Sequence, residues 1–286
     1  MSDQAEQTTG TAFSEYLKMP VNRAQLLAGI GAGLAAALLP AAAGAQRTGD
    51  FTVPFFPQIT SGSYTTESIQ EILNSVVTAH YLGATGGTMT LSNAAAVGLT
   101  GWQLSTQQAA AASEQYRIDF LTSLGAKPVT TAFTFPSGSV SKRAVVLATA
   151  EGSATIQVGL HMTAAREFAE LGQPTLAKSM YQMGNQVSEQ RAIYRTLQAI
   201  DGVPTAVPPN NKAFATDLFL YTRDAIALYR ALGLIGGSSP AVSYPGRAAV
   251  LAAAGPMASA VIQKTPNNAT STITLTGLAS VTGERV

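Results

Sequence analysis

The sequence contains no cysteine and only two histidines, His80 and His161. The absence of cysteine excludes disulfide bonds, thiolate metal sites and cysteine nucleophiles, although it does not fix the cellular compartment. Charged residues are scarce too, because they form 12% of the 286 residues, about half of the usual share. The net charge of +1, without a basic run, gives no indication of electrostatic binding to nucleic acid.

Motifs of common enzymes are also absent. The chain has no Gly-x-Ser-x-Gly elbow, no Walker A loop, no Gly-x-Gly-x-x-Gly after an expected strand and no zinc-ligand spacing. A di-iron carboxylate bundle usually takes Glu-x-x-His from two helices, because residues three apart reach the same ion. No Glu-x-x-His occurs here; at this spacing Glu114 is followed by Arg117. We therefore expect no metal, no cofactor and no enzymatic activity.

The first 45 residues have the layout of an export signal. Lys18 and Arg23 precede an apolar run, and the small residues Ala43-Gly44-Ala45 follow it. Such a basic, apolar and small-residue order is typical of secretory signals. The stretch NRAQLL resembles a twin-arginine signal with Asn22 in place of the first arginine. We expect an exported protein that is periplasmic or at the cell surface.

Two alternatives for this segment stay open. Residues 24–43 approach the minimum length of a membrane span, so an uncleaved anchor would attach the protein to a membrane. A buried helix is the other alternative. Residues 46–65 hold prolines, glycines and an aromatic cluster, and we expect them to form an extended linker.

Hydrophobic periodicity predicts an all-α protein organised around the segment 175–200. This segment follows Pro174 and contains no proline and only one glycine, Gly184. One face recurs at alternating spacings of four and three residues, as a core-facing helix requires. Its members are Leu176, Met180, Met183, Val187, Gln190, Tyr194 and Leu197. Gln190 is the polar member of this otherwise largely apolar face.

Similar patterns place the other elements. Helices are predicted over about 66–82, 105–124, 140–171 and 212–234, with a short one over 244–255. Gly83, Gly86 and Gly87 are expected to weaken or stop the first helix. Residues 88–104 are then expected to form a long loop that has room for a short strand pair and contains a buried Trp102. Residues 126–139 form a connector with strand-like alternation, and the C-terminus forms a strand or tail.

Five segments in order carry a family resemblance. They are EILNSVVTAHYL, SEQYRIDFLTSLGA, IQVGLHMTAA, QVSEQRAIYRTL and YPGRAAVLAAAG, within about residues 66–255. This series resembles the exported ferritin-like family that includes desiccation-related proteins. The resemblance implies a ferritin-like antiparallel four-helix bundle over 66–201. It leaves 202–286 for a fifth helix, a short sixth helix and an extended tail.

The resemblance also implies where the family's metal ligands would lie. Position by position they fall on His80, Glu114, Arg117, Ile156, Val187 and Gln190. The position of Ile156 is loose, and its neighbour Gln157 is the alternative. Only Glu114 keeps the family's ligand type, so we expect a degenerate metal site.

Arg117 places a guanidinium near the site where the metal charge would be in the family. We expect it to pair with Glu114, while His80 and Gln190 satisfy the remaining polar groups. The alternative is that Arg117 extends outward and Glu114 is solvated.

The sequence therefore favours a non-catalytic structural or interaction protein of the cell envelope or of an extracellular assembly. Its partners would be proteins or further copies of this chain. A metal-binding ferritin-like oxidoreductase or iron binder is one alternative. A bundle that binds a small molecule in a pocket lined by Met180, Met183, Tyr194 and His80 is the other.

Overall fold

The computed structural model describes residues 66–203, 206 and 219–260 of the chain. The predicted export signal (1–45), the linker (46–65), the first part of the predicted helix at 212–234 and the C-terminal tail lie outside these residues.

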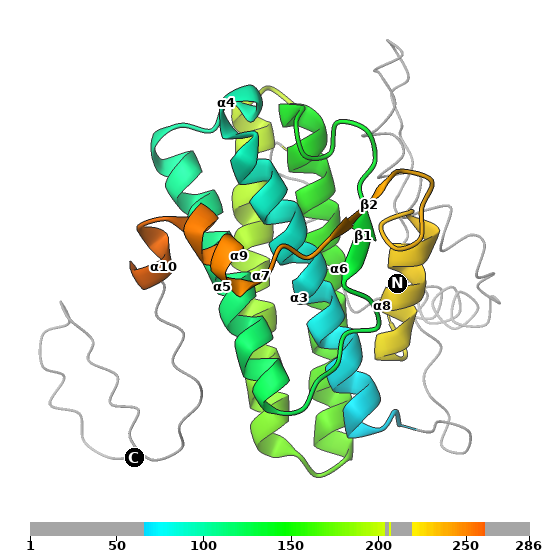
Figure 1. Ribbon diagram of the computed structural model, residues 1–286. Coiled ribbons are helices and arrows are strands. Elements are labelled where there is room, and N and C mark those ends of the chain that lie inside the picture. Colours follow the sequence, from blue (N-terminus) through cyan, green and yellow to red (C-terminus); the bar gives the residue numbers. More distant parts are fainter. Residues whose placement is uncertain (1–65, 204–205, 207–218, 261–286) are drawn as a thin grey trace, which may run out of the picture.

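The described part of the protein is mainly helical. Four long helices lie side by side (Figure 1): α3 (Ile69–Ser92), α5 (Gly101–Ser123), α6 (Arg143–Glu170) and α7 (Pro174–Ile200). Four shorter helices accompany them: α4 (Ala94–Val97), α8 (Thr222–Ala231), α9 (Arg247–Ala254) and α10 (Met257–Ala260). The strands β1 (Ala132–Thr134) and β2 (Ala241–Ser243) form a two-stranded antiparallel ladder in which Phe133 is opposite Val242. The all-α class is confirmed.

The path of the chain gives the four long helices a particular order. α5 runs back along α3, and α7 runs back along α6 after the short turn 171–173 (Figure 1). Between these two pairs, residues 124–142 travel from one end of the long helices to the other and carry β1 along the way (Figure 1). α5 and α6 therefore run in the same direction, and one long crossover connects the two antiparallel pairs.

Local chemistry sets the ends of these helices. Ser68 and Glu71 form a full capping box at the start of α3, so this helix begins at Ile69 rather than near residue 66. Pro174 occupies the first turn of α7, where its missing N–H costs no hydrogen bond. Gly172 adopts φ of 68°, which lets the chain reverse between α6 and α7.

The expectation that glycines stop the first helix was wrong. α3 continues through Gly83, Gly86 and Gly87 to Ser92, and none of these three glycines has a positive φ. The predicted loop over 88–104 is instead the end of α3, the short α4 and the start of α5. Trp102 lies in the first turn of α5 and is 54% exposed, so it is not a buried anchor.

The predicted helix over 212–234 is shorter than expected where it is described, because α8 begins only at Thr222. A carboxylate from a distant part of the chain fixes this start. Glu67 accepts hydrogen bonds from the Thr222 hydroxyl at 2.6 Å and from the Arg223 backbone N–H at 3.3 Å. A carboxylate at this end satisfies free N–H groups and complements the positive end of the helix dipole.

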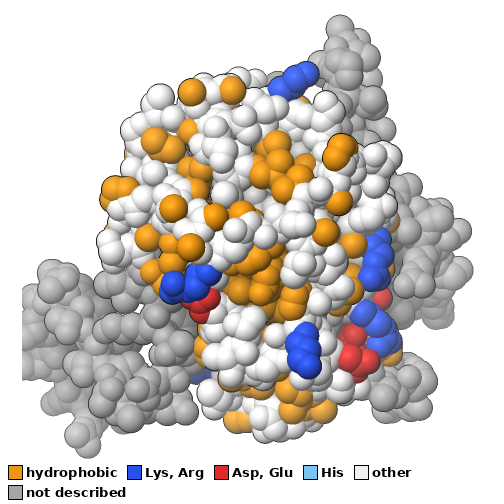
Figure 2. All heavy atoms as spheres, viewed as in Figure 1, with side chains coloured by type: hydrophobic (Ala, Val, Ile, Leu, Met, Phe, Trp, Pro, Cys, Tyr) orange, Lys and Arg blue, Asp and Glu red, His pale blue; other side chains and the backbone are white. Residues whose placement is uncertain are grey.

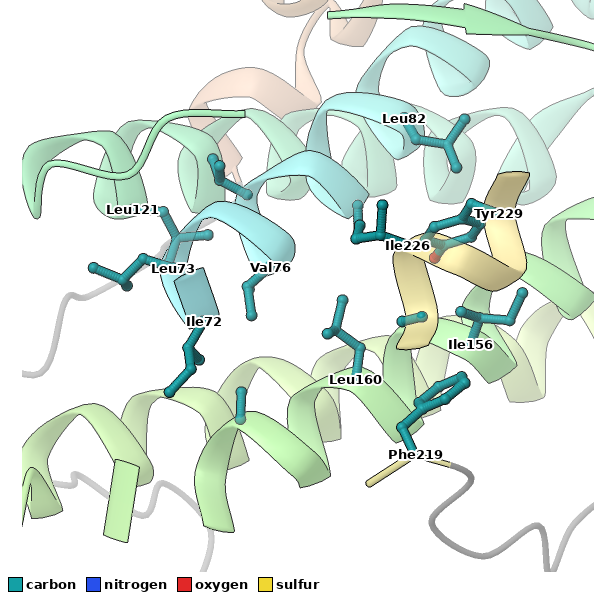
Figure 3. Packing of buried hydrophobic residues seen from close by; sticks show 14 of the residues in the cluster. Ile72, Leu73, Val76, Leu82, Leu121, Ile156, Leu160, Phe219, Ile226 and Tyr229 are labelled. Carbon is teal, nitrogen blue, oxygen red and sulfur yellow. The ribbon is translucent and has the colours of Figure 1, made fainter. Parts of the chain in front are cut away.

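The long helices and α8 share one hydrophobic core (Figure 3). Ile72, Leu121 and Leu160 come from three of the long helices, and Ile226 and Tyr229 come from α8. α8 packs against α3 and α6, whereas α9 packs against α3 and α5. The C-terminal helices therefore belong to the same packed unit as the long helices.

The surface seen in Figure 2 is dominated by apolar and uncharged polar atoms, and acidic and basic side chains are few there. This agrees with the low charge content of the sequence. Within residues 66–203 and 219–260, no helix is long and apolar enough to cross a membrane.

Candidate functional site

A cluster of four buried polar side chains lies between α3, α5 and α6. It consists of His80 on α3, Glu114 and Arg117 on α5, and His161 on α6, and the exposed fraction is 6% for Glu114 and 0% for the other three. His80 Nδ1 lies 2.6 Å from Glu114 Oε2, and Arg117 Nη1 donates to Glu114 Oε1 at 2.9 Å. His80 Nε2 lies 3.2 Å from His161 Nε2. We call this set the buried charge network.

The expected pairing of Arg117 with Glu114 and His80 is present, and the alternative of an outward-pointing arginine is wrong. The expected part for Gln190 is also wrong. The second guanidinium nitrogen of Arg117 donates to Gln186 Oε1 at 3.2 Å, one helical turn before Gln190 on α7. A carboxylate that is buried between a histidine and an arginine keeps hydrogen bonds on both oxygens, which is what makes its burial tolerable.

The hydrogen bonds also locate the protons of the network. His161 Nδ1 lies 2.6 Å from the backbone carbonyl of Gln157, which can only accept, so this nitrogen carries the hydrogen. The other nitrogen of a neutral His161 then accepts from His80 Nε2–H. The 2.6 Å contact between His80 Nδ1 and Glu114 then requires a proton between these two atoms. Burial lowers the pKa of His80, and Glu114 opposes this shift.

Burial and neighbouring charges shift the pKa values of these groups by different causes. Burial opposes the charge of Glu114, but His80 and Arg117 outweigh it and hold the pKa of this carboxyl below its usual range. Burial lowers the pKa of the Arg117 guanidinium, and Glu114 opposes this shift. Burial and the neighbouring His80 place the pKa of His161 well below its ordinary value, so His161 is neutral. The network combines one carboxylate with compensating positive charge rather than a cluster of acids.

Two glycines make room for the network. A Cβ at position 83 of α3 would lie 2.9 Å from the Glu114 carboxyl carbon. Glycine at this position therefore leaves the space that Glu114 occupies when it contacts His80. A Cβ at Gly184 would lie 3.0 Å from His161 Cβ, so this glycine lets α7 approach α6 closely. Gly184 is the one glycine of segment 175–200. A single glycine inside a long helix indicates a close approach of another helix, and this was the sequence feature that could have pointed to α6.

A pocket of about 90 Å³ lies beside the network. Glu114, Gln107 and Tyr194 line it together with the three glycines of α3, and Ser139 and Thr149 line it from the crossover and from α6. Met180, Met183 and His80 do not line it, so the predicted lining is wrong except for Tyr194. The two methionines are part of the hydrophobic core instead.

The remaining predicted positions separate into core and pocket. Ile156 and Val187 are 1% and 0% exposed and pack as apolar core residues. Gln190 is half-buried and lines the pocket. Gln157, the alternative to Ile156, also lines the pocket, and its side-chain amide donates to the Ala79 carbonyl at 3.2 Å. Sequence reasoning named Gln157 only as this alternative, and it missed His161 and Gln186 as members of this region.

The residues at these positions do not fit a di-iron centre. Such a centre takes four carboxylates and two histidines, whereas Glu114 is the one carboxylate at the six positions and its oxygens already accept from Arg117 and His80. Arginine has no acceptor atom and cannot be a ligand. Among the described residues, no group of three or more His, Asp or Glu side chains is arranged to hold a metal ion.

Comparisons of the chain with protein-family models, with curated proteins and with solved structures found no match. The ferritin-like resemblance therefore rests on the quoted sequence segments.

Proposed function

We propose that the protein is a ferritin-like four-helix bundle that has exchanged its metal centre for the buried charge network, and that it acts as a non-catalytic structural or interaction protein. The observation that carries the proposal is the pair Glu114–Arg117. Arg117 stands where the family has the histidine of a Glu-x-x-His, and its guanidinium is bound to the remaining glutamate at 2.9 Å. A guanidinium is a fixed positive charge that cannot leave by deprotonation, so it substitutes for the charge of an ion.

The path of the chain supports the ferritin-like assignment. Ferritin-like bundles have one long crossover connection, whereas simple up-and-down bundles have only short loops. Here the single long crossover among the four long helices is 124–142, between the second and the third of them. The buried cluster is also where such bundles build their sites, on facing side chains in the bundle interior.

The surface supports an interaction role. Tyr181 and Ile200 on α7 are 70% and 61% exposed, Trp102 on α5 is 54% exposed and Met162 on α6 is 44% exposed. Large aromatic side chains are enriched in protein interfaces. The sparse charge on the surface is unusual for a protein that stays free in solution. We propose that the partners are proteins or further copies of this chain, and that the protein works outside the cytoplasm.

Metal analysis of the purified full chain tests the first half of the proposal. After incubation with iron(II) or manganese(II) and removal of free ion, we expect far less than one bound ion per chain, because the ligand positions hold Arg117, Val187 and Gln190. A variant with His80→Glu, Arg117→His, Ile156→Glu, Val187→Glu and Gln190→His places the family's ligand types at all six positions and is the positive control. Stoichiometric iron or manganese in the unaltered protein would overturn the proposal in favour of a metal-binding ferritin-like protein.

The second half is tested by the mass of the protein in solution and in envelope extracts. We expect assemblies larger than one chain in light scattering after size-exclusion chromatography. Tyr181→Ser should reduce the mass of these assemblies. Gln182→Ser changes the neighbouring exposed residue, so it is the matched control and should leave the mass unchanged. A monodisperse single chain that the Tyr181 change leaves unaltered speaks against the interaction role.

A further inference from the structure

The pocket beside the buried charge network has a wall that combines polar groups with small side chains. Gly83, Gly86 and Gly87 of α3 and Ala110, Ala111, Ala150 and Ala154 of α5 and α6 leave the space open. Lining residues such as Gly86, Phe135 and Ala150 are half-buried, so the pocket lies at the edge of the core rather than at its centre.

Two hydroxyls on this wall have no hydrogen-bond partner among the described residues. They are Ser139 Oγ, in a residue that is 4% exposed, and Thr149 Oγ1. A buried hydroxyl without a partner costs free energy, and each such group in a folded protein calls for an explanation. Both residues line the same pocket. A ligand in this pocket would give both hydroxyls a hydrogen-bond partner.

The charge of the wall restricts what the pocket accepts. Glu114 is the only Asp, Glu, Lys, Arg or His among the lining residues, and Arg117 and His80 already bind its two oxygens. Tyr194 is neutral, because burial raises its pKa to about 12. A charged ligand would lose its hydration without gaining an opposite charge. The wall therefore favours a neutral ligand.

The size and the polar groups narrow the ligand further. The pocket is smaller than the roughly 150 Å³ apolar cavity that holds one benzene, and it exceeds the roughly 10–15 Å³ of cavity volume that one water needs. Hydroxyls and the amides of Gln107 and Gln190 can donate and accept, while Phe135 and Leu234 offer apolar contact. We propose that this pocket binds a small neutral polyol of about three carbons through Ser139 and Thr149. The proposal is independent of the lost metal site and of the structural role.

Glycerol is the probe, and NMR of the full chain is the measurement. We expect saturable shifts of the backbone amides of Gly86, Ala150 and Ser153 in the millimolar range, as is usual for a ligand with so few atoms. Saturation at specific amides separates binding from the general effect of a co-solvent. Propionate and propylammonium, which are similar in size but charged, should produce no saturable shift at these amides.

Matched variants assign the binding to the two hydroxyls. Ser139→Ala and Thr149→Val should each weaken glycerol binding by about threefold to tenfold, the equivalent of one hydrogen bond. Ser141→Ala in the same connector and Thr155→Val on the same helix are the controls and should leave it unchanged. Ser139→Ala should also leave the stability of the ligand-free protein unchanged or higher, because it removes a hydroxyl without a partner. A purely structural hydroxyl would instead lower stability and leave binding unchanged.

Ala150→Leu provides a second route, since it fills the pocket without touching a polar group. It should abolish the glycerol shifts, while urea unfolding reports whether the variant still folds. The proposal is overturned if glycerol gives no saturable shift, if Ser139→Ala and Thr149→Val bind glycerol as tightly as the controls, or if benzene or the charged probes bind in its place.

Discussion

One helical turn on α5 separates two kinds of core. Leu121 is 0% exposed and lies in a cluster of apolar side chains with Leu73 and Val76 of α3. Arg117, four residues earlier, is also 0% exposed but lies against Glu114 and Gln186. The apolar end is specified by shape and volume, whereas the polar end is specified by charge balance and hydrogen bonds. A substitution at the polar end therefore leaves a buried charge without a partner, while a smaller side chain at the apolar end leaves a cavity.

The largest effect is expected at the polar end, from Arg117→Met. This change leaves the buried Glu114 carboxylate with His80 as its one remaining partner in the network, which should cost about 3–5 kcal/mol of the free energy of unfolding. Urea denaturation measures the loss. The double variant Glu114→Gln/Arg117→Met removes both charges and should recover most of it. A single-variant cost below about 1 kcal/mol would mean that the network is solvated.

Leu121→Ala tests the apolar end on the same helix. It should cost about 3 kcal/mol through lost transfer energy and the cavity that remains. Because no titratable group is involved, the loss should be the same at pH 5 and at pH 7.5. A loss that changes strongly with pH would show that the two ends are coupled.

The pH dependence of the free energy of unfolding is expected to arise at the polar end, because the titratable groups lie there. His161 has a depressed pKa in the folded protein and the ordinary value near 6.5 in the unfolded chain. Below pH 6.5 the unfolded chain therefore binds the proton that the folded chain does not, and stability falls as the pH falls. The slope approaches about 1.4 kcal/mol per pH unit at most.

In the variant His161→Leu, this part of the slope should disappear between pH 7.5 and 5.5. Burial also lowers the pKa of His80, so part of the loss should remain in this range, and a further loss should come at lower pH, where Glu114 takes up a proton through its own depressed pKa. Thermal unfolding across this range measures the difference. An unchanged slope would contradict a neutral, buried His161.

The smallest effects are expected from two glycines on the same helix. Gly83→Ala pushes a methyl group to 2.9 Å from the Glu114 carboxyl carbon and should destabilise the protein by about 1 kcal/mol or more. Gly87→Ala meets only ordinary contacts, at 3.6 Å from Gln107 Nε2, and should stabilise the helix by up to about 1 kcal/mol. Equal effects of the two changes, measured by urea denaturation, would show that Glu114 is not held against α3.

The sequence predicted the long helices well where apolar periodicity is strong. The segment 175–200 became α7 (Pro174–Ile200), and 140–171 became α6 (Arg143–Glu170). It failed at Gly83 and Gly86, because these glycines provide space for Glu114 and Phe135 instead of a turn. Such a role depends on side chains that approach from other helices, and single-helix periodicity does not contain that information.

The site shows the same division. The pair Glu114–Arg117 followed from a spacing of three on one helix, which is a local property. His161 and Gln186 could not be assigned, because helical spacing gives a face but not the partner across the interface. Gln190 was chosen where Gln186, one turn away on α7, receives the hydrogen bond from Arg117.

Glu67 has a consequence for the order of folding. Its carboxylate begins α8 although 155 residues separate Glu67 from Thr222. Contacts this distant in the chain form only after a large loop has closed. We therefore expect the first turn of α8 to become stable only once the segment ahead of α3 has docked. A chain that begins after residue 67 keeps all four long helices and loses the group that starts α8.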